Sequence, residues 1–357
     1  MLNTQFRMPS EQINFNGQNV QFANFGILDS SGNRATINGN ILVRSFSDMN
    51  MDLRLRATNW QAMSSTAEQN KDFYGRLFLT TNMTIQGPLA APSIDGSLNI
   101  LKGTSVTATV PATQTTIQES EGIVEFIDAS NPNRYTMLTT KDTSRKLGQF
   151  APGSNINLNV SSDEEAEFSV IVDEGTGDFV KIRGKADLNT TVAPDGTLGI
   201  VGTYEIKEGS YHFNYNFIRR LFKIQPGSRI TFSGDPNDAE LDVTAVYEAN
   251  VPPYDLVSRQ VPDPSTLVFF KQRLPFEVEM KLTGPLMKPD INFDIVLPED
   301  RNYRVSGDVQ DLVNARLSQL RQSPSEMNKQ VFALIILNRF VTENVFESGV
   351  EGGGVSN

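Results

Sequence analysis

The chain has 357 residues, no cysteine, one histidine and a formal net charge of −11. This composition excludes disulfides, thiol nucleophiles, thiolate metal sites and histidine-cluster metal sites, and the acidic balance argues against binding to nucleic acid. The 22 Phe and many β-branched residues are typical of a folded chain, and no apolar run is long enough to span a bilayer as a helix.

Residues 1–300 show apolar and polar side chains alternating in segment after segment. Met51, Leu53 and Leu55 alternate with polar residues, and the same pattern recurs at 156–160 and 276–282. Period-two alternation predicts strands with one apolar and one polar face. Turn sequences rich in Gly, Asn, Asp and Pro separate these segments, so the pattern predicts an all-β domain of about 20 strands.

One early segment interrupts the strand pattern. Between residues 59 and 71, the apolar residues Trp60, Met63 and Ala67 are spaced by three and four, and few residues are β-branched. This spacing predicts a short helix or turn over 59–71.

The pattern changes again after residue 300. Apolar residues at 309–320 follow a period of 3.6, which predicts a helix over 307–322. The sequence Ser323-Pro324-Ser325-Glu326 has the form of a capping box with proline at the first helical position, and it predicts a second helix that frays near Phe346. We therefore expect a two-helix segment at 301–347, followed by a flexible Gly-rich tail at 348–357.

A ten-residue pattern occurs twice, at 85–94 and at 282–291. Both copies have the form apolar-x-Gly-Pro-Leu-x-x-Pro-x-Ile. Glycine gives a free φ, and the two prolines prevent helix formation and backbone donation, so each copy predicts a rigid corner between two strands. Its recurrence about 200 residues apart indicates a repeated β architecture.

The sequence resembles the C-terminal domain of the TamB family, a subunit of the translocation and assembly module of Gram-negative bacteria, and most closely its Bacteroidetes branch. The matching stretches are NKDFYG at 70–75, the two Gly-Pro corners, Gly103-Thr104 leading to Pro111, GIVEFID at 122–128, Gly202-x-Tyr204, Gly209-Ser210-Tyr211, Ile230-x-Phe232-x-Gly234 and EMNKQVFALIIL at 326–337. They span nearly the whole chain in family order.

The resemblance implies a β-taco, which is an elongated antiparallel or mixed sheet curled into a repeating groove, over residues 1–300. It also implies a non-enzymatic periplasmic scaffold that carries phospholipid acyl chains between membranes or assists outer-membrane barrel assembly. The expected partners are an Omp85-class outer-membrane barrel protein, through C-terminal strands beyond residue 357, and the inner membrane, through an N-terminal anchor. The chain is then a fragment of a longer protein.

The alternating faces predict which side chains line such a groove. The candidates are Met51, Leu53, Leu55, Ile156, Leu158, Val160, Phe168, Val170, Val172, Phe276, Val278, Met280, Ile291, Phe293 and Ile295. Alternation alone favours an ordinary sandwich, in which two sheets cover each other's apolar faces, and it is the resemblance that favours the groove. With about 20 strands at ~4.8 Å each, the groove is expected to be on the order of 100 Å long.

Two other functions remain open from the sequence: an extracellular β-helical glycan-processing enzyme, and a purely structural or adhesive β-solenoid. The enzyme would need two carboxylates converging in a polar cleft, and no motif joins two of them. The acidic runs at 163–167 and 173–178 fit turns rather than calcium loops. His212 is expected on the face opposite to Tyr211 and Phe213. We therefore predict no catalytic residue, no metal and no cofactor.

Overall fold

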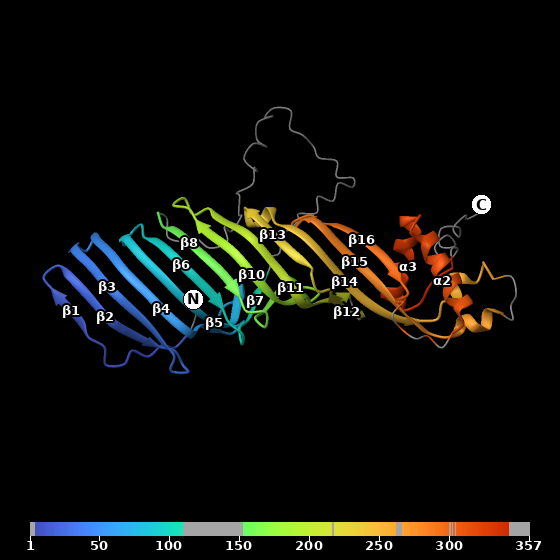
Figure 1. The fold of residues 1–357 in the computed structure, drawn as a ribbon, viewed down its shortest axis with the longest axis horizontal. Coiled ribbons are helices and arrows are strands. Elements are labelled where there is room, and N and C mark those ends of the chain that lie inside the picture. Colours follow the sequence, from blue (N-terminus) through green and yellow to red (C-terminus); the bar gives the residue numbers. More distant parts are fainter. Residues whose placement is uncertain are drawn as a thin grey trace, which may run out of the picture.

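The computed structural model describes residues 4–109, 153–215, 218–261, 266–299, 301, 303 and 305–342. Within these residues, 16 strands form one continuous sheet, and short helices follow near the C-terminus. Figure 1 shows an elongated molecule with β1 at one end and the helices at the other. The predicted all-β fold, a single elongated mixed sheet with a helical C-terminal segment, is confirmed. The tail at 348–357, Phe346 and the matching stretch at 122–128 lie outside the described residues.

The elements have the following bounds. The strands are β1 (Ile13–Asn16), β2 (Asn19–Leu28), β3 (Arg34–Ser45), β4 (Asp48–Ser65), β5 (Phe73–Pro88), β6 (Ser93–Ile100), β7 (Ser105–Thr109), β8 (Asn155–Ser162), β9 (Glu167–Asp173), β10 (Asp178–Val192), β11 (Leu198–Tyr215), β12 (Ile218–Ile224), β13 (Arg229–Gly234), β14 (Glu240–Val251), β15 (Leu274–Pro285) and β16 (Asp290–Val296). The helical elements are η2 (Pro236–Asp238), α1 (Tyr254–Val257), η3 (Thr266–Lys271), α2 (Gly307–Leu320) and α3 (Pro324–Leu337).

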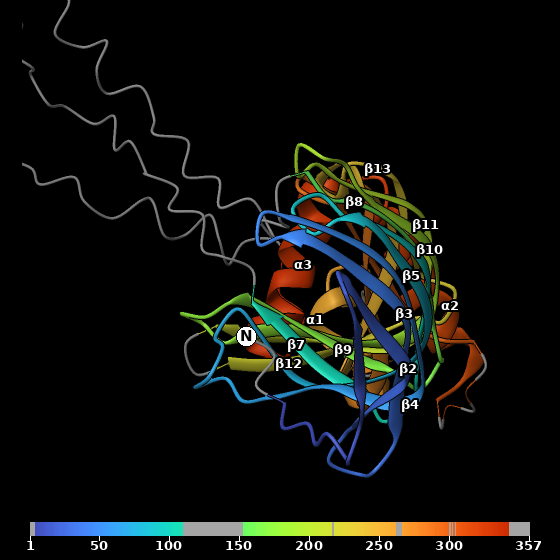
Figure 2. The same cartoon turned by 90° about the vertical axis from the view of Figure 1, so that its left-hand side faces the viewer.

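Four long strands, β5, β10, β11 and β14, change partner along their length; β14 pairs with β13 at residues 240–242 and with β12 at 245–246. β5 pairs with β6 through its second half and with β7 through its first half. β10 pairs with β8 and β9 in the same manner, and β11 pairs with β13 and β12. Most neighbours in the described sheet are antiparallel, but β6 pairs with β8 and β7 with β9 in parallel. The partner changes divide the sheet into two walls that meet along a crease, and Figure 2 shows the sheet curled around this line.

Buried hydroxyl groups repair the backbone pairing at the crease. The Ser162 hydroxyl donates to the Gly184 carbonyl at 2.9 Å and accepts from the Ala186 amide at 2.8 Å. Thr104 exchanges two similar bonds with the backbone of Phe78 in β5. Ladder bonds are lost where a strand bends, and a buried unpaired backbone group costs free energy. Ser162 at the end of β8 and Thr104 just before β7 therefore stabilise the bends in the long neighbouring strands.

Glycine makes the bend in β10 possible. The register shifts between Arg183 and Gly184, and a Cβ atom at Gly184 would lie 2.1 Å from the Glu205 carbonyl oxygen. No side chain tolerates a contact this short, so the bulge requires glycine at this position.

Of the short helix or turn predicted over 59–71, the helix is wrong, because β4 continues as a strand to Ser65, and a turn is found only at 67–69. Register shifts between Ala57 and Trp60 and between Gln61 and Met63 insert extra residues into the strand, and Asn59 has a φ of 50°. An extra residue in a bulge changes the apolar spacing from two to three, which imitates helical spacing.

Both predicted C-terminal helices are present, but α3 ends at Leu337, where Asn338 has a φ of 52°, and does not continue toward Phe346 as expected. α3 begins with Pro324 at its first position, but the Ser323 side chain forms no capping bond, and Glu326 instead pairs with Lys329 at 2.7 Å. A second helical region, α1 and η3 between β14 and β15, was not predicted.

The Gly-Pro repeat forms two equivalent corners. The Leu89 amide donates to the Met49 carbonyl at 2.9 Å, and the Leu286 amide donates to the Ala239 carbonyl at 2.7 Å. Gly87 and Gly284 have positive φ values of 92° and 82°. The two copies therefore extend the sheet by one hydrogen bond in the same way, as expected for a repeated architecture.

Candidate functional site

The two faces of the sheet differ sharply in polarity. On one face, Asn189 of β10 donates to Asn157 and Asn159 of β8, and Arg229 of β13 pairs with Asp242 of β14 at 2.9 Å. We call this polar, solvent-exposed side the outer face. This face is solvated along the sheet, because its polar side chains form hydrogen bonds with one another and with water.

The opposite side, which we call the inner face, carries apolar rows that cross several strands. One row contains Leu53, Ile85, Ile94, Ile156 and Val192, which are paired in register from β4 to β10. Helices α1 and α3 lie on this side, within the curl of the sheet (Figure 2). The apolar rows therefore line the concave side.

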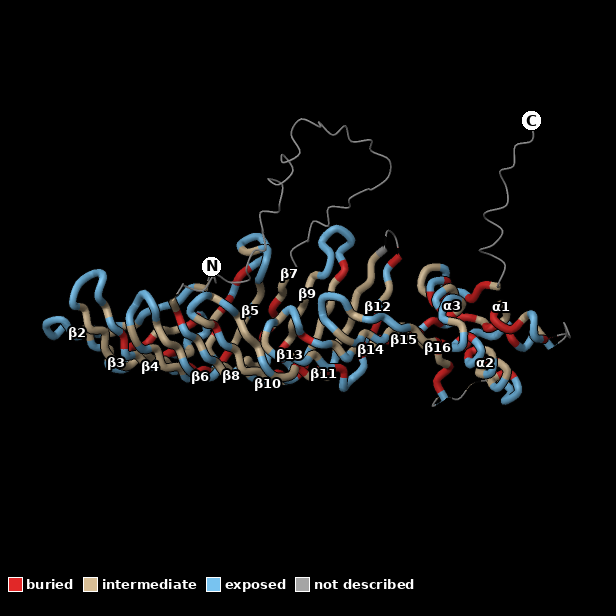
Figure 3. Tube along the Cα trace, turned by 90° about the horizontal axis from the view of Figure 1, so that it is seen from above, coloured by how far each residue is buried: buried red, intermediate tan, exposed pale blue. Residues whose placement is uncertain are grey.

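Most of the inner face is only partly covered. Leu53, Leu55, Leu158 and Val160 are half-buried, and the strands around them belong to a single sheet. Figure 3 shows intermediate exposure along much of this region. The sandwich interpretation required a second sheet over these residues, and the described strands form none.

The predicted lining residues fall into four groups by burial. The half-buried members are Leu53, Leu55, Ile156, Leu158, Val160, Phe168, Val170, Met280 and Phe293, while Met51 is buried, and Val172 and Ile291 are exposed. The remaining three, Phe276, Val278 and Ile295, are completely buried. They belong to the core beneath the helices, so the prediction that they line an open surface is wrong.

This C-terminal core closes one end of the inner face. Val313 and Leu317 of α2 and Val331 and Leu334 of α3 are buried in the same cluster as β14, β15 and β16 residues. The Arg220 side chain of β12 donates to the Ile335 carbonyl at 2.6 Å, near the end of α3. The helices therefore pack on the apolar face itself rather than beside it.

A second apolar cluster, which the lining prediction largely missed, lies where β9 to β14 meet. Its buried members include Tyr204, Ile206 and Phe222, and Phe168 contacts Tyr204 edge-on with ring centroids 6.0 Å apart. Tyr204 follows Gly202 and Ile206 lies at the bulge opposite Gly184, where regular alternation is lost, whereas Phe222 lies in the regularly alternating strand β12. The apolar residues that continue at alternate positions after Gly202, beginning with Tyr204 and Ile206, are the sequence signal that would have identified this part of the cluster.

Tyr204 also carries an unsatisfied polar atom. Its hydroxyl group is buried and has no hydrogen-bond partner, and burial raises its pKa above the ordinary value. A buried donor without a partner lowers stability.

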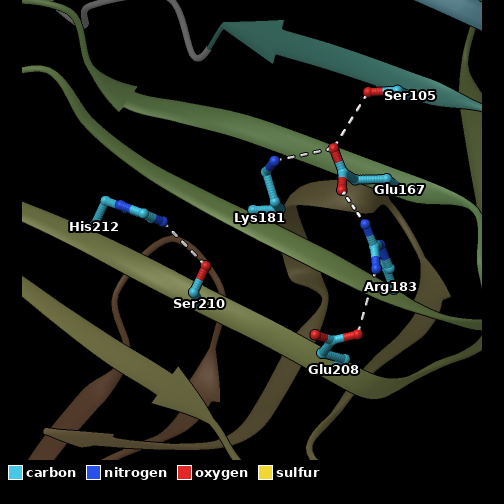
Figure 4. A network of polar contacts seen from close by, with 7 residues as sticks. All are labelled: Ser105, Glu167, Lys181, Arg183, Glu208, Ser210 and His212. Carbon is cyan, nitrogen blue, oxygen red and sulfur yellow. Dashed lines mark hydrogen bonds and ion pairs between the residues drawn. The ribbon is translucent and has the colours of Figure 1, made fainter.

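The outer face carries a charged network, shown in Figure 4. Glu167 of β9 pairs with Lys181 at 3.1 Å and with Arg183 at 2.8 Å, both on β10. Burial alone would raise the pKa of Glu167, but the hydrogen bonds from these two cations outweigh it and hold the pKa below its ordinary value. Ser105 donates to Glu167, and Arg183 also pairs with Glu208, so the network joins β7, β9, β10 and β11.

His212 lies on the outer face, away from Tyr211 and Phe213, as predicted. Its ring stacks on Phe179 with centroids 4.1 Å apart, and Nε2 lies 3.2 Å from the Ser210 hydroxyl. Burial, and then repulsion by Lys181, lowers its pKa. This environment favours a neutral, packed imidazole.

A comparison with protein families decides where the chain belongs. The model for the TamB C-terminal domain matches residues 23–357. The chain belongs to the TamB C-terminal domain family. No curated protein and no solved structure matches it.

TamB-family proteins act in the translocation and assembly module of the cell envelope, together with an Omp85-type partner. The match confirms the predicted TamB resemblance and does not resolve the Bacteroidetes branch. No helix among the described residues of this TamB-family chain is long and apolar enough to cross a membrane. The described residues also contain no group of three or more His, Cys, Asp or Glu side chains placed to hold a metal ion.

Proposed function

We propose that the inner face binds the acyl chains of phospholipids and guides them through the periplasm between the two membranes. The observation that carries the proposal is a continuous apolar face, only half-buried, on a sheet that no second sheet covers among the residues that the structure describes. Membership of the TamB family supports the setting, which is the cell envelope with an Omp85-class outer-membrane partner.

The energetics favour acyl chains as the occupant. Each methylene group moved from water onto an apolar surface stabilises the complex by about 0.8 kcal/mol. The rows of Leu, Ile, Val and Met offer such a surface, while the polar outer face stays in water. Headgroups would remain at the open side, and no residue needs to act as a catalyst.

The apolar face is shorter than the predicted number of strands suggested. The main path of the described sheet runs through 13 strands, which at ~4.8 Å each gives roughly 60 Å instead of the expected 100 Å. Short strands that stack off this path, such as β7 and β9, deepen the walls rather than lengthen the sheet. The path also ends at the C-terminal core, so lipid would leave through the open side before it reaches β15 residues Phe276 and Val278.

Site-specific photocrosslinking tests the proposal with a matched control in one strand. A photoreactive residue at Leu158 faces inward, and the same residue at Asn159 faces outward. We expect crosslinks to phospholipid at position 158 and none at position 159, with phospholipid also found by mass spectrometry of the purified protein. Equal labelling at both positions would refute an acyl-binding inner face, and crosslinks from 158 to polypeptide would assign the face to barrel assembly instead.

A further inference from the structure

Strand β12 has one edge that is only partly paired. β14 pairs with it at residues 223–224 alone, through residues 245–246. From residue 247 onward β14 pairs with β15 on its other edge, and no further strand among those described pairs with β12 on this side. An unpaired strand edge offers its N–H and C=O groups to another chain.

The last ladder bond shows which backbone groups face this edge. The Gln225 amide donates to the Thr244 carbonyl at 2.8 Å. Alternate residues of an antiparallel strand direct their N–H and C=O groups to the same side, so Leu221 and Arg219 direct theirs to the unpaired edge. The residues between them face β11, which pairs with β12 along its whole length. The edge is therefore held in strand geometry although its outer side is open.

A hollow of about 310 Å³ lies along this edge, between β12 and β14. Its lining includes Leu221 and Lys223 of β12 and Glu248 of β14, all three exposed. Leu221 is in register with His212, so this side of β12 belongs to the outer face. We call the hollow, together with the β12 edge at 219–223, the edge slot.

Arg220 closes the edge slot on the inner side. Its guanidinium lies over the Tyr247 ring of β14, 5.7 Å from the centroid, and donates to the Ile335 carbonyl of α3 at 2.6 Å. These contacts link β12 to β14 and α3 beneath the hollow. A ligand would therefore enter from the outer face.

The edge slot is cationic in a chain of net charge −11. The charged side chains of its lining are Arg219, Arg220, Lys223, Arg301, Glu248 and Glu277. Arg301 already pairs with both carboxylates, with Glu248 at 2.9 Å and with Glu277 at 3.1 Å. Arg219 and Lys223 are exposed and form no ion pair with a residue that the structure describes. Two cations beside the free edge thus remain for a ligand.

Backbone and charge together select the occupant. A row of alternating N–H and C=O groups is satisfied by an extended polypeptide, which adds a strand to the edge. Cations along an edge repel basic strands and leave uncharged strands without a counter-charge, so an acidic strand is the complementary one.

A second copy of this chain fits the edge slot less well. Its acidic edge strand is β16, where Arg321 already holds the Asp294 carboxylate at 2.9 Å and the Ile295 carbonyl at 3.2 Å. The edge strand at the other end, β1, carries no charge. Neither edge offers free carboxylates in an extended segment.

We propose that the edge slot binds an extended acidic segment of another polypeptide chain, which adds a strand to β12 and places carboxylates beside Arg219 and Lys223. Because the slot opens on the outer face, this binding does not depend on lipid at the inner face.

Fluorescence anisotropy with the full chain tests the role of charge. The probe is a labelled peptide in which Thr and Glu alternate, and the variant is Arg219→Gln with Lys223→Gln. Loss of both cations should weaken binding by about fivefold or more, and a peptide of alternating Thr and Lys should bind more weakly than the acidic one. The matched control is Arg54→Gln with Arg56→Gln, which removes two exposed cations from β4 and should bind as the unaltered chain does.

Hydrogen exchange tests the backbone pairing within one strand. The Leu221 amide faces the edge slot, and the Phe222 amide faces β11. Saturation with the acidic peptide should slow exchange at Leu221 by about tenfold or more and leave exchange at Phe222 unchanged.

Three results would overturn the proposal. The first is a failure of the acidic peptide to bind the unaltered chain, and the second is an equal loss of affinity in the variant and in its matched control. The third is protection of Leu221 in a concentration-dependent dimer without peptide, since the edge would then join two copies of the chain. Phospholipid crosslinking at Leu158 is measured separately and reports on the inner face alone.

Discussion

At β10, the hydroxyl group of Ser162 in the neighbouring strand β8 holds the crease between the two walls, and Ser162→Ala removes it. Ser162 is buried at the end of β8 and joins the Gly184 carbonyl and the Ala186 amide of β10. Alanine has nearly the same volume, so the substitution leaves packing intact and deletes only these two bonds.

The magnitude follows from the two backbone groups left without partners. A buried donor or acceptor that loses its partner costs about 1–3 kcal/mol, and water has little access at this position. We therefore expect Ser162→Ala to lower the free energy of local opening by about 2–4 kcal/mol. The adjacent Ser161 is exposed and donates only to the Asn99 side chain at 3.2 Å, so Ser161→Ala should cost less than about 0.5 kcal/mol.

Hydrogen exchange of the Ala186 amide is the direct assay, because this amide is the donor to Ser162. Each 1.4 kcal/mol corresponds to a tenfold change, so its protection should fall by more than tenfold in Ser162→Ala and stay nearly constant in Ser161→Ala. Urea unfolding followed by circular dichroism gives a second measure. If Ala186 keeps its protection in Ser162→Ala, the reasoning that side chains repair the crease is refuted.

Three further predictions concern the same region. Tyr204→Phe removes an unpartnered buried hydroxyl and should raise the midpoint of urea unfolding by an amount equivalent to about 1 kcal/mol; a lower midpoint would reveal a partner for that hydroxyl. Gly184→Ala places a Cβ 2.1 Å from the Glu205 carbonyl oxygen and should cost more than about 2 kcal/mol, measured in the same unfolding experiment; a neutral result would contradict the need for glycine. Because the pKa of Glu167 is lowered in the fold, its ion pairs stabilise the protein above about pH 4.5, and this contribution is lost as the pH falls through the lowered value. Glu167→Gln should therefore reduce the loss of stability on acidification, and parallel pH curves for the two proteins would argue against it.

The sequence predicted the faces of the strands well. Alternation through Leu53 and Leu158 placed both side chains on the same apolar face, because the side-chain period of a strand is fixed at two. The start of α3 was predicted correctly, since proline at the first helical position has a local cause.

The errors have a different physical origin. Bulges at Trp60 and Met63 changed the local period, which local spacing alone does not reveal. Alternation also reports which face a residue occupies and not what covers that face, so Phe276 and Ile295 were assigned to an open surface although α2 and α3 pack over them. Coverage by a distant helix is a tertiary property.

The uneven placement of the core makes the order of unfolding predictable. In a single sheet, each strand is stabilised chiefly by its two neighbours, as in a row of linked units with nearest-neighbour coupling. The helical end adds a large buried cluster to β14, β15 and β16, whereas β1 is exposed along its whole length and pairs only with β2 among the described strands. On heating, the strands should therefore unfold in order from β1 toward the helices, and the helical end should unfold last.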